Sequence, residues 1–289
     1  MTLRKGIKRL ARDGIVTSRP GVGHVVLSEH PLRKYALLFG LDPLSPRSSS
    51  FHQKLAYWLR KHFTQEETEP AFVVLDREDR AESKLSEIRR RFRMGEFAGA
   101  LLIHWSRYIA PLEEEILASK LPFLSVSIHG TNPNHLVLGQ WELVTEAYHW
   151  LARHDRLPAT AICTHVSSAE SDLAKMPGLN VLLYHHVPDV YRLTQTALSA
   201  NPSPKTIIVP DDVAQVHAQA AILAKPQSAL PLLAHMAIKR DIYPAGVPRL
   251  LLEIDPQNVA AFCLQWLRGF STTSQHGVIP IRPNLREQV

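Results

Sequence analysis

Cysteine is scarce in this sequence of 289 residues: Cys163 and Cys263 are the only two, and both lie within apolar runs. They form no closely spaced pair, which argues against a disulfide framework and against a thiolate metal site. Apolar runs are also short. None approaches the roughly eighteen residues of a membrane span, and the N-terminus lacks the apolar segment of a signal peptide. We therefore expect an unprocessed cytoplasmic protein in a reducing compartment, without membrane contact.

Enzyme signatures are missing as well. The sequence contains no Gly-x-Ser-x-Gly nucleophile elbow, no His-Glu-x-x-His zinc motif and no phosphate-binding P-loop. Its 15 histidines are scattered without the spacing of metal ligands. These absences argue against an enzyme, and we expect no catalytic residue, no bound metal and no cofactor.

Positive charge is abundant at one end only. The formal net charge is +6, and residues 1 to 34 hold eight Lys or Arg against Asp13 and Glu29, so the remaining 25 basic and 25 acidic residues cancel. Clustered cations favour a polyanion, because neutralised phosphates release their counterions. The pattern indicates a nucleic-acid partner for this segment, and a solvated basic helix remains the alternative.

The basic segment has a regular pattern of its own. Apolar residues recur at helical spacing from Thr2 to Asp13, with Gly14 as the stop. Two short β-prone runs follow, Ile15 to Thr17 and His24 to Leu27, separated by a turn rich in Pro and Gly. The spacing predicts one amphipathic helix followed by a β-hairpin.

The run TLRKGIKRLARDGIVTSRPGVGHVV resembles the recognition helix and wing of GntR-type regulators. The resemblance implies a partial winged helix-turn-helix module over residues 1 to 30 that contacts operator DNA. A helix fits the major groove, and a cationic hairpin tip can approach the neighbouring backbone. By this resemblance the DNA-binding residues are Thr2, Arg4, Lys5, Lys8, Arg19 and Gly21.

In the resembled family two helices precede the recognition helix, whereas Met1 stands directly before it here. We therefore expect an incomplete DNA-binding module with weak, salt-dependent binding. Either Met1 is an internal methionine taken as the start, or the gene has lost the preceding helices. The sequence leaves both readings open.

From residue 31 to 289 short apolar strands alternate with amphipathic helices, which argues for parallel sheets covered on both faces. This region resembles the effector domain of LacI/GalR-type repressors in the order of four segments: MGEFAGALLIHW, KLPFLSVS, TIIVPDDVAQVHAQAAI and EIDPQNVAAFCLQWL. The resemblance implies an α/β fold of the periplasmic-binding-protein type with two Rossmann-like lobes. Lobe one is expected at about 35 to 155 plus 249 to 271, and lobe two at about 159 to 236 plus 272 to 289.

Ligands of open α/β sheets bind at the carboxyl ends of the strands, so polar and aromatic residues there are candidates. Phe51 and Trp105 offer flat faces for a sugar ring, and carboxylates or Arg77 can hydrogen-bond hydroxyls or an anion. Asp212 fits the role of a helix cap equally well, and each loop histidine also fits the role of a surface residue. The ligand-binding candidates are Phe51, Asp76, Arg77, His104, Trp105, His129, His165, Asp211, Asp212 and His235.

The sequence also departs from the LacI pattern. Ala234 to Ala237 stand where the family usually has Gly-Phe-Asp-Asp, so one expected acidic sugar contact is absent. The effector is therefore left open between a sugar, another small polar molecule and none.

Together these features predict a ligand-responsive, homodimeric DNA-binding transcription regulator. The alternatives are a stand-alone small-molecule-binding protein and a regulator that has lost DNA binding.

Overall fold

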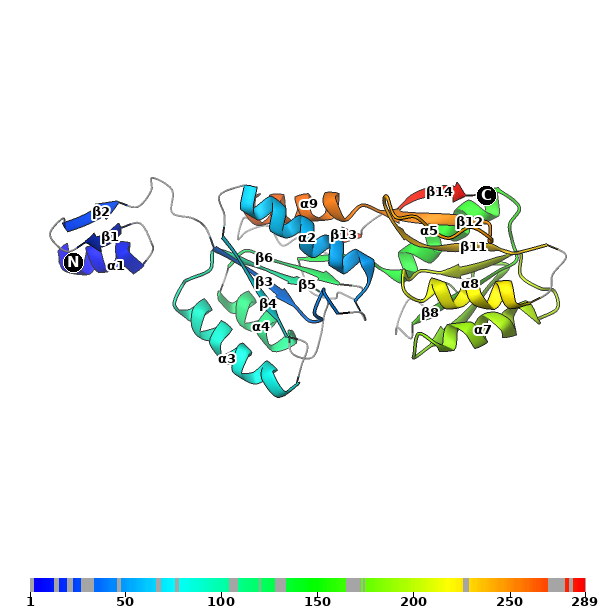
Figure 1. Cartoon of the computed structure of the whole chain (residues 1–289), viewed down its shortest axis with the longest axis horizontal. Coiled ribbons are helices and arrows are strands. Elements are labelled where there is room, and N and C mark those ends of the chain that lie inside the picture. Colours follow the sequence, from blue (N-terminus) through cyan, green and yellow to red (C-terminus); the bar gives the residue numbers. More distant parts are fainter. Residues whose placement is uncertain are drawn as a thin grey trace.

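A computed structural model of the whole chain describes residues 3–12, 16–19, 23–26, 34–45, 48–65, 69–75, 78–103, 109–119, 121–127, 134–164, 173, 175–225, 229–269, 279–280 and 283–288. These residues form a small helix-hairpin unit and two α/β lobes (Figure 1). Within these ranges no helix is long and apolar enough to cross a bilayer.

The N-terminal unit consists of helix α1 (Leu3–Arg12) and the antiparallel strands β1 (Val16–Arg19) and β2 (Gly23–Val26). This agrees with the helix and hairpin that the sequence predicts. Lys5 and Lys8 are exposed on α1. Arg4 lies on α1 and Arg19 lies on β1, but their side chains are outside the described part of the structure. Thr2 and Gly21 lie outside the described residues. Figure 1 shows the unit lying apart from the two lobes.

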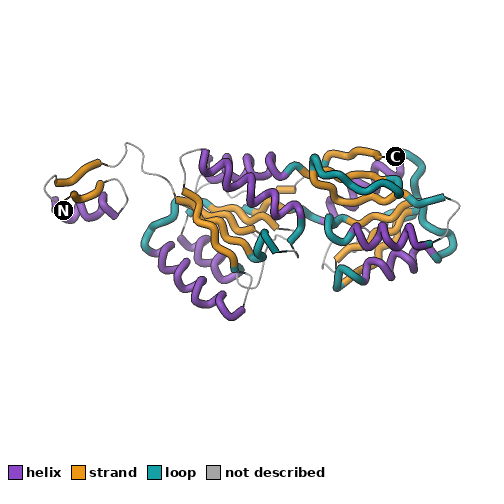
Figure 2. The backbone as a smooth tube through the Cα atoms, viewed as in Figure 1, coloured by secondary structure: helices purple, strands orange, loops and turns teal. Residues whose placement is uncertain are grey.

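Lobe one is built on a parallel sheet in the order β13-β7-β6-β5-β3-β4. Helices cover both faces of this sheet, as Figure 2 shows. Its strands are β3 (Lys34–Phe39), β4 (Glu69–Val74), β5 (Gly99–Ile103), β6 (Phe123–Ser127), β7 (His135–Val137) and β13 (Ile279–Pro280). Its helices are α2 (Ser50–Gln65), α3 (Glu78–Arg93), α4 (Ala110–Ser119) and α9 (Pro256–Gly269).

The alternation of side chains along each strand explains how lobe one fills two cores. Tyr35, Leu37 and Phe39 of β3 pack with α2 and α9, whereas Ala36 and Leu38 point to the opposite face, against α3 and α4. Strands buried on both faces read as continuous apolar runs, which is the pattern that the sequence shows.

Lobe two holds the second sheet, in the order β14-β12-β11-β10-β8-β9, with β14 antiparallel to the rest. Its strands are β8 (Ala159–Thr164), β9 (Leu179–Tyr184), β10 (Thr206–Val209), β11 (Leu232–Ile238), β12 (Arg249–Ile254) and β14 (Asn284–Gln288). Helix α5 (Gln140–Arg153) packs on one face, and α7 (Asp189–Leu198) and α8 (Gln215–Ala224) pack on the other.

The lobe boundaries differ from the sequence-based ones. Segment 249 to 271 was expected in lobe one, but its first strand, β12, pairs with β11 in lobe two. Segment 272 to 289 was expected in lobe two, but it divides, because β13 joins β7 in lobe one. Helix α5, expected in lobe one, contacts strands of lobe two. The chain thus passes between the lobes after β7, after β12 and after β13. The very short strands β7 and β13 carry too little periodicity to mark these crossings.

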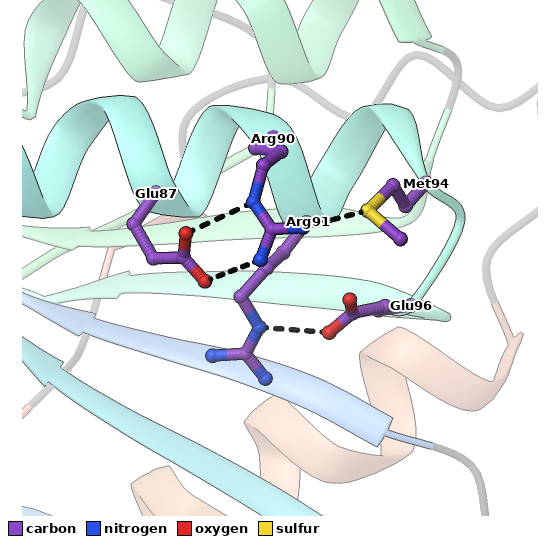
Figure 3. Close-up of polar contacts among 5 residues, drawn as sticks. All are labelled: Glu87, Arg90, Arg91, Met94 and Glu96. Carbon is purple, nitrogen blue, oxygen red and sulfur yellow. Dashed lines mark hydrogen bonds and ion pairs between the residues drawn. The ribbon is translucent and has the colours of Figure 1, made fainter.

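The arginines near the end of α3 are paired with acidic side chains. Near the end of α3, Arg90 donates two hydrogen bonds to Glu87 at 2.9 and 3.0 Å, and Arg91 donates one to Glu96 at 2.8 Å (Figure 3). Arg89 and Arg93 each pair with Glu115 of α4. Exposed pairs of this kind contribute little to stability. Each of the four arginines thus has a carboxylate partner, with Glu115 shared by Arg89 and Arg93.

Candidate ligand-binding cleft between the lobes

A cavity of about 170 Å³ lies where the carboxyl ends of strands from both lobes meet. This is the position at which open parallel sheets bind ligands. Lobe one contributes the loop after β3 and the first turn of α2, and lobe two contributes the loop after β10 and part of β11. Its walls are formed by Leu41, Ser49, Phe51, His52, Leu138, Gln140, Val187, Pro210, Asp211, Asp212, Val213 and Met236.

The lobe-one wall is the start of α2. The Ser49 hydroxyl accepts a hydrogen bond from the backbone N–H of His52 at 3.3 Å and lies 2.7 Å from His52 Nδ1. Ser49 therefore acts as an N-cap, a role that serine commonly fills. Phe51, the second residue of the helix, is almost fully buried and belongs to the cavity wall.

The lobe-two wall presents two adjacent carboxylates. Oδ1 of Asp211 accepts hydrogen bonds from the backbone N–H groups of Val213 at 2.8 Å and Ala214 at 2.7 Å. Tyr184 donates its hydroxyl to Oδ2 of Asp211 at 3.4 Å. Asp211 is thus engaged in holding the turn before α8, and this turn fixes the position of Asp212.

Asp212 bridges the two lobes. Its Oδ2 accepts a hydrogen bond from the backbone N–H of Phe51 at 3.2 Å. Burial raises the pKa of Asp212 to about 7, the neighbouring charge of Asp211 adds to the rise, and backbone N–H donors oppose it. In the folded protein Asp212 therefore holds its proton more tightly than an exposed aspartate does.

Gln140 stands at the first crossing between the lobes, as the first residue of α5. Its buried side-chain oxygen accepts hydrogen bonds from the backbone N–H of Thr164 at 3.0 Å and from the Thr164 hydroxyl at 2.9 Å. It therefore ties the crossing to the end of β8, next to the cavity. Sequence reasoning missed Gln140, because a glutamine at a helix start carries no recognisable signal.

The structure brings three predicted ligand residues together: Phe51, Asp211 and Asp212 all line the cavity. Six other predicted residues lie outside the described part of the chain, namely Asp76, Arg77, His104, Trp105, His129 and His165. Within the described part, no group of three His, Cys, Asp or Glu side chains converges in a way that could hold a metal ion.

His235 does not line this cavity, contrary to the sequence-based expectation. It is fully buried within β11, with Nδ1 2.8 Å from the carbonyl oxygen of Met236 and Nε2 2.9 Å from Nη1 of Arg249. Arg249 can only donate, so Nε2 accepts and Nδ1 carries the proton. Burial lowers the pKa of His235 to about 4, and Arg249 contributes to the lowering.

Strand alternation accounts for this correction. The sequence suggested that the strand ends near His235, but β11 continues to Ile238. His235 therefore points to the α8 face, where Arg249 also contacts Gln215 and Gln219. Its neighbour Met236 points the other way and lines the cavity. The alternation along a correctly bounded strand would have identified Met236.

No protein-family model matches this chain, and no curated protein matches it. Solved structures do match. The regulator Cra from Pseudomonas putida, in complex with fructose 1-phosphate, is 12% identical with a TM-score of 0.62, covering 89% of this chain and 99% of that chain. A LacI family regulator from Bifidobacterium animalis subsp. lactis is 14% identical with a TM-score of 0.63, covering 88% and 95%.

A periplasmic solute-binding protein of an ABC transporter from Actinobacillus succinogenes, with bound D-allose, is similar too. It is 13% identical with a TM-score of 0.60, covering 88% of this chain and 97% of that chain. At these identities the likeness shows the fold alone. The expected α/β architecture of the periplasmic-binding-protein type, with two parallel-sheet lobes, is thereby confirmed.

Proposed function

We propose that this chain is a ligand-responsive DNA-binding transcription regulator. The observation that carries the proposal is the cavity between the lobes, whose walls come from both sheets. A ligand that contacts both walls has a different affinity for open and closed lobes, so its binding biases their arrangement. This is the property that a sensor domain needs.

A small polar effector, with sugars as the leading class, fits the cleft. Phe51 is an apolar part of the wall, and Asp212 offers a carboxylate that can accept hydrogen bonds from hydroxyl groups. Similar structures with bound D-allose, lactose and fructose 1-phosphate support this choice of class. The proposed contacts also include the predicted residues that lie outside the described part of the chain, namely Asp76, Arg77, His104, Trp105, His129 and His165.

The N-terminal helix and hairpin are the proposed DNA-binding part. The exposed Lys5 and Lys8 lie on one helix of a segment that holds the whole net positive charge of the chain. We propose operator DNA as the partner, with Arg4 and Arg19 as further contacts. We also propose a homodimer, because two-fold symmetric operators are read by two copies. Such a protein acts in the cytoplasm, and the free cysteines Cys163 and Cys263 suit a reducing compartment.

A stand-alone solute-binding protein is the second candidate. It is favoured by the similarity to solute-binding proteins, which share the two-lobed fold. DNA binding distinguishes the two candidates, because a regulator must contact DNA and a stand-alone solute-binding protein does not.

The test of the sensing site is a thermal-shift screen of sugars, sugar phosphates and small organic acids. A compound that binds the folded protein raises the melting temperature by mass action. We expect at least one hit, and we expect Asp212→Ala to abolish its shift. Glu114→Ala, which removes an exposed carboxylate on α4 outside the cavity wall, should leave the shift unchanged. A hit whose shift survives in Asp212→Ala removes that residue from the site.

A further inference from the structure

The first turn of α2, in lobe one, is bound directly by two carboxylates of lobe two. The Ser50 hydroxyl donates to Oδ2 of Asp241 at 2.9 Å, and Lys54 forms an ion pair with Oδ1 of the same residue. The backbone N–H of Phe51 donates to Asp212 at 3.2 Å. Figure 1 shows α2 with one end directed at lobe two. The start of α2, from Ser50 to Lys54, therefore carries three bonds to lobe two.

The two sides are electrostatically complementary. Lobe one presents the start of a helix, where backbone N–H groups carry partial positive charge, together with the ammonium group of Lys54. Lobe two presents carboxylates, and charge-assisted hydrogen bonds of this kind are stronger than neutral ones. The side chains of Lys54 and Asp241 are 36% and 25% exposed, so the ion pair is partly shielded from water.

Asp241 is held in place by its own lobe. It lies in the loop between β11 and β12, where its backbone N–H donates to the carbonyl oxygen of Ile238 at 2.9 Å. The hydroxyl of Tyr243 accepts the backbone N–H of Ile238 at 2.7 Å, and Arg249 donates to the carbonyl oxygen of Pro244 at 3.1 Å. The loop is thereby fixed to the strands on either side of it, so Asp241 is in position to bind α2.

We propose that Ser50, Phe51 and Lys54, together with Asp212 and Asp241, form an interlobe clamp that holds the cleft shut without a ligand. Every donor and acceptor in the clamp belongs to the chain itself, so no ligand group is needed to complete it. The effector then acts on lobes that are already together. This inference rests on the proposed function only in taking the cleft as the sensing site.

The two carboxylates have different roles in the clamp. Asp212 lines the cavity, so a ligand hydroxyl or ammonium group that reaches it competes with the N–H of Phe51. Asp241 is absent from the described cavity wall, and its carboxylate bonds across the cleft to Ser50 and Lys54. Asp241 therefore sets the basal closure, and a change there tests the clamp without altering the ligand wall.

The experiment measures the lobe separation of the free protein by double electron-electron resonance. Spin labels are attached in an A118C/R192C background, on exposed positions of α4 in lobe one and α7 in lobe two. The native Cys163 and Cys263 are fully buried and escape labelling. D241N is compared with E253Q, which removes the carboxylate of an ion pair with Arg286 that lies wholly within lobe two. Circular dichroism checks that each variant folds.

We expect D241N to lengthen the mean label distance by more than about 2 Å, the scale of genuine domain rearrangement, and to broaden its distribution. E253Q should match the parent. K54M should reproduce the D241N change, and the double variant should add little to it, because both remove one interaction. Unchanged distances in both D241N and K54M overturn the clamp. Ligand binding in the thermal-shift screen is independent of this result, so the clamp and the proposed function can fail separately.

Discussion

Replacing Asp212 by Asn isolates the electrostatic effect of the paired carboxylates in the cleft. In the folded protein the pKa of Asp212 is about 7, against an ordinary value of 3.8. Asn has nearly the same shape and cannot ionise. The variant therefore keeps an oxygen that can accept the N–H of Phe51 while removing the ionisation itself.

The sign of the effect follows from proton binding. Because the folded pKa is raised, the folded protein holds the proton of Asp212 more tightly than the unfolded chain does. This contribution to stability is fully present below the unfolded pKa, is lost as the pH rises from about 4 to about 7, and stays lost above it. The shift corresponds to roughly 4 kcal/mol, at about 1.4 kcal/mol per pKa unit, which is an upper bound for a cleft that can admit water.

The assay is urea unfolding of wild type and Asp212→Asn, followed by circular dichroism at half-unit steps between pH 4 and pH 8. We expect the free energy of unfolding of the variant, relative to wild type, to increase by about 2–4 kcal/mol between pH 4 and pH 7 and then to level off. A difference that is constant across this range, or that decreases with pH, refutes the assignment of a raised pKa to Asp212.

Three further predictions concern other parts of the chain. His235→Gln should show the opposite trend. The pKa of His235 is about 4 in the folded protein, so wild type loses stability as the pH falls from 6.5 to 4. Over that window the free energy of unfolding of the variant should increase by up to roughly 3 kcal/mol relative to wild type. Arg249→Met should lower the free energy of unfolding by about 3 kcal/mol in urea titrations, because Gln215 and Gln219 lose their buried donor. Lys5→Ala should reduce the salt dependence of DNA binding, measured by anisotropy, by about one unit of slope.

Much of the fold follows from the sequence because the strands are buried on both faces. Runs such as YALLFG and RLLLEI are long and apolar enough to mark β3 and β12, and the helices between them repeat at the expected spacing. The lobe to which β12 belongs does not follow from the sequence in this way. Which sheet a strand joins depends on pairing between distant segments, such as Leu250 with Ala234, and local periodicity does not encode that pairing.

The candidate site was predictable where it follows directly from a strand end. Asp211 and Asp212 come right after β10, and they do line the cavity. Met236 and Gln140 were not predictable, because one depends on the true end of β11 and the other on where the chain crosses between lobes. The Asp241 contact with α2 joins residues 191 positions apart in the chain, and no local pattern points to it.

The central claim is that a ligand in the cleft changes DNA binding, and fluorescence anisotropy of a labelled DNA duplex tests it most directly. The duplex is titrated with the chain at low salt, with and without the strongest compound from the thermal-shift screen. We expect the compound to change the apparent dissociation constant at least 5-fold, a coupling of about 1 kcal/mol, in wild type and not in Asp212→Ala. A compound that binds the cleft and leaves the DNA titration of wild type unchanged contradicts the claim.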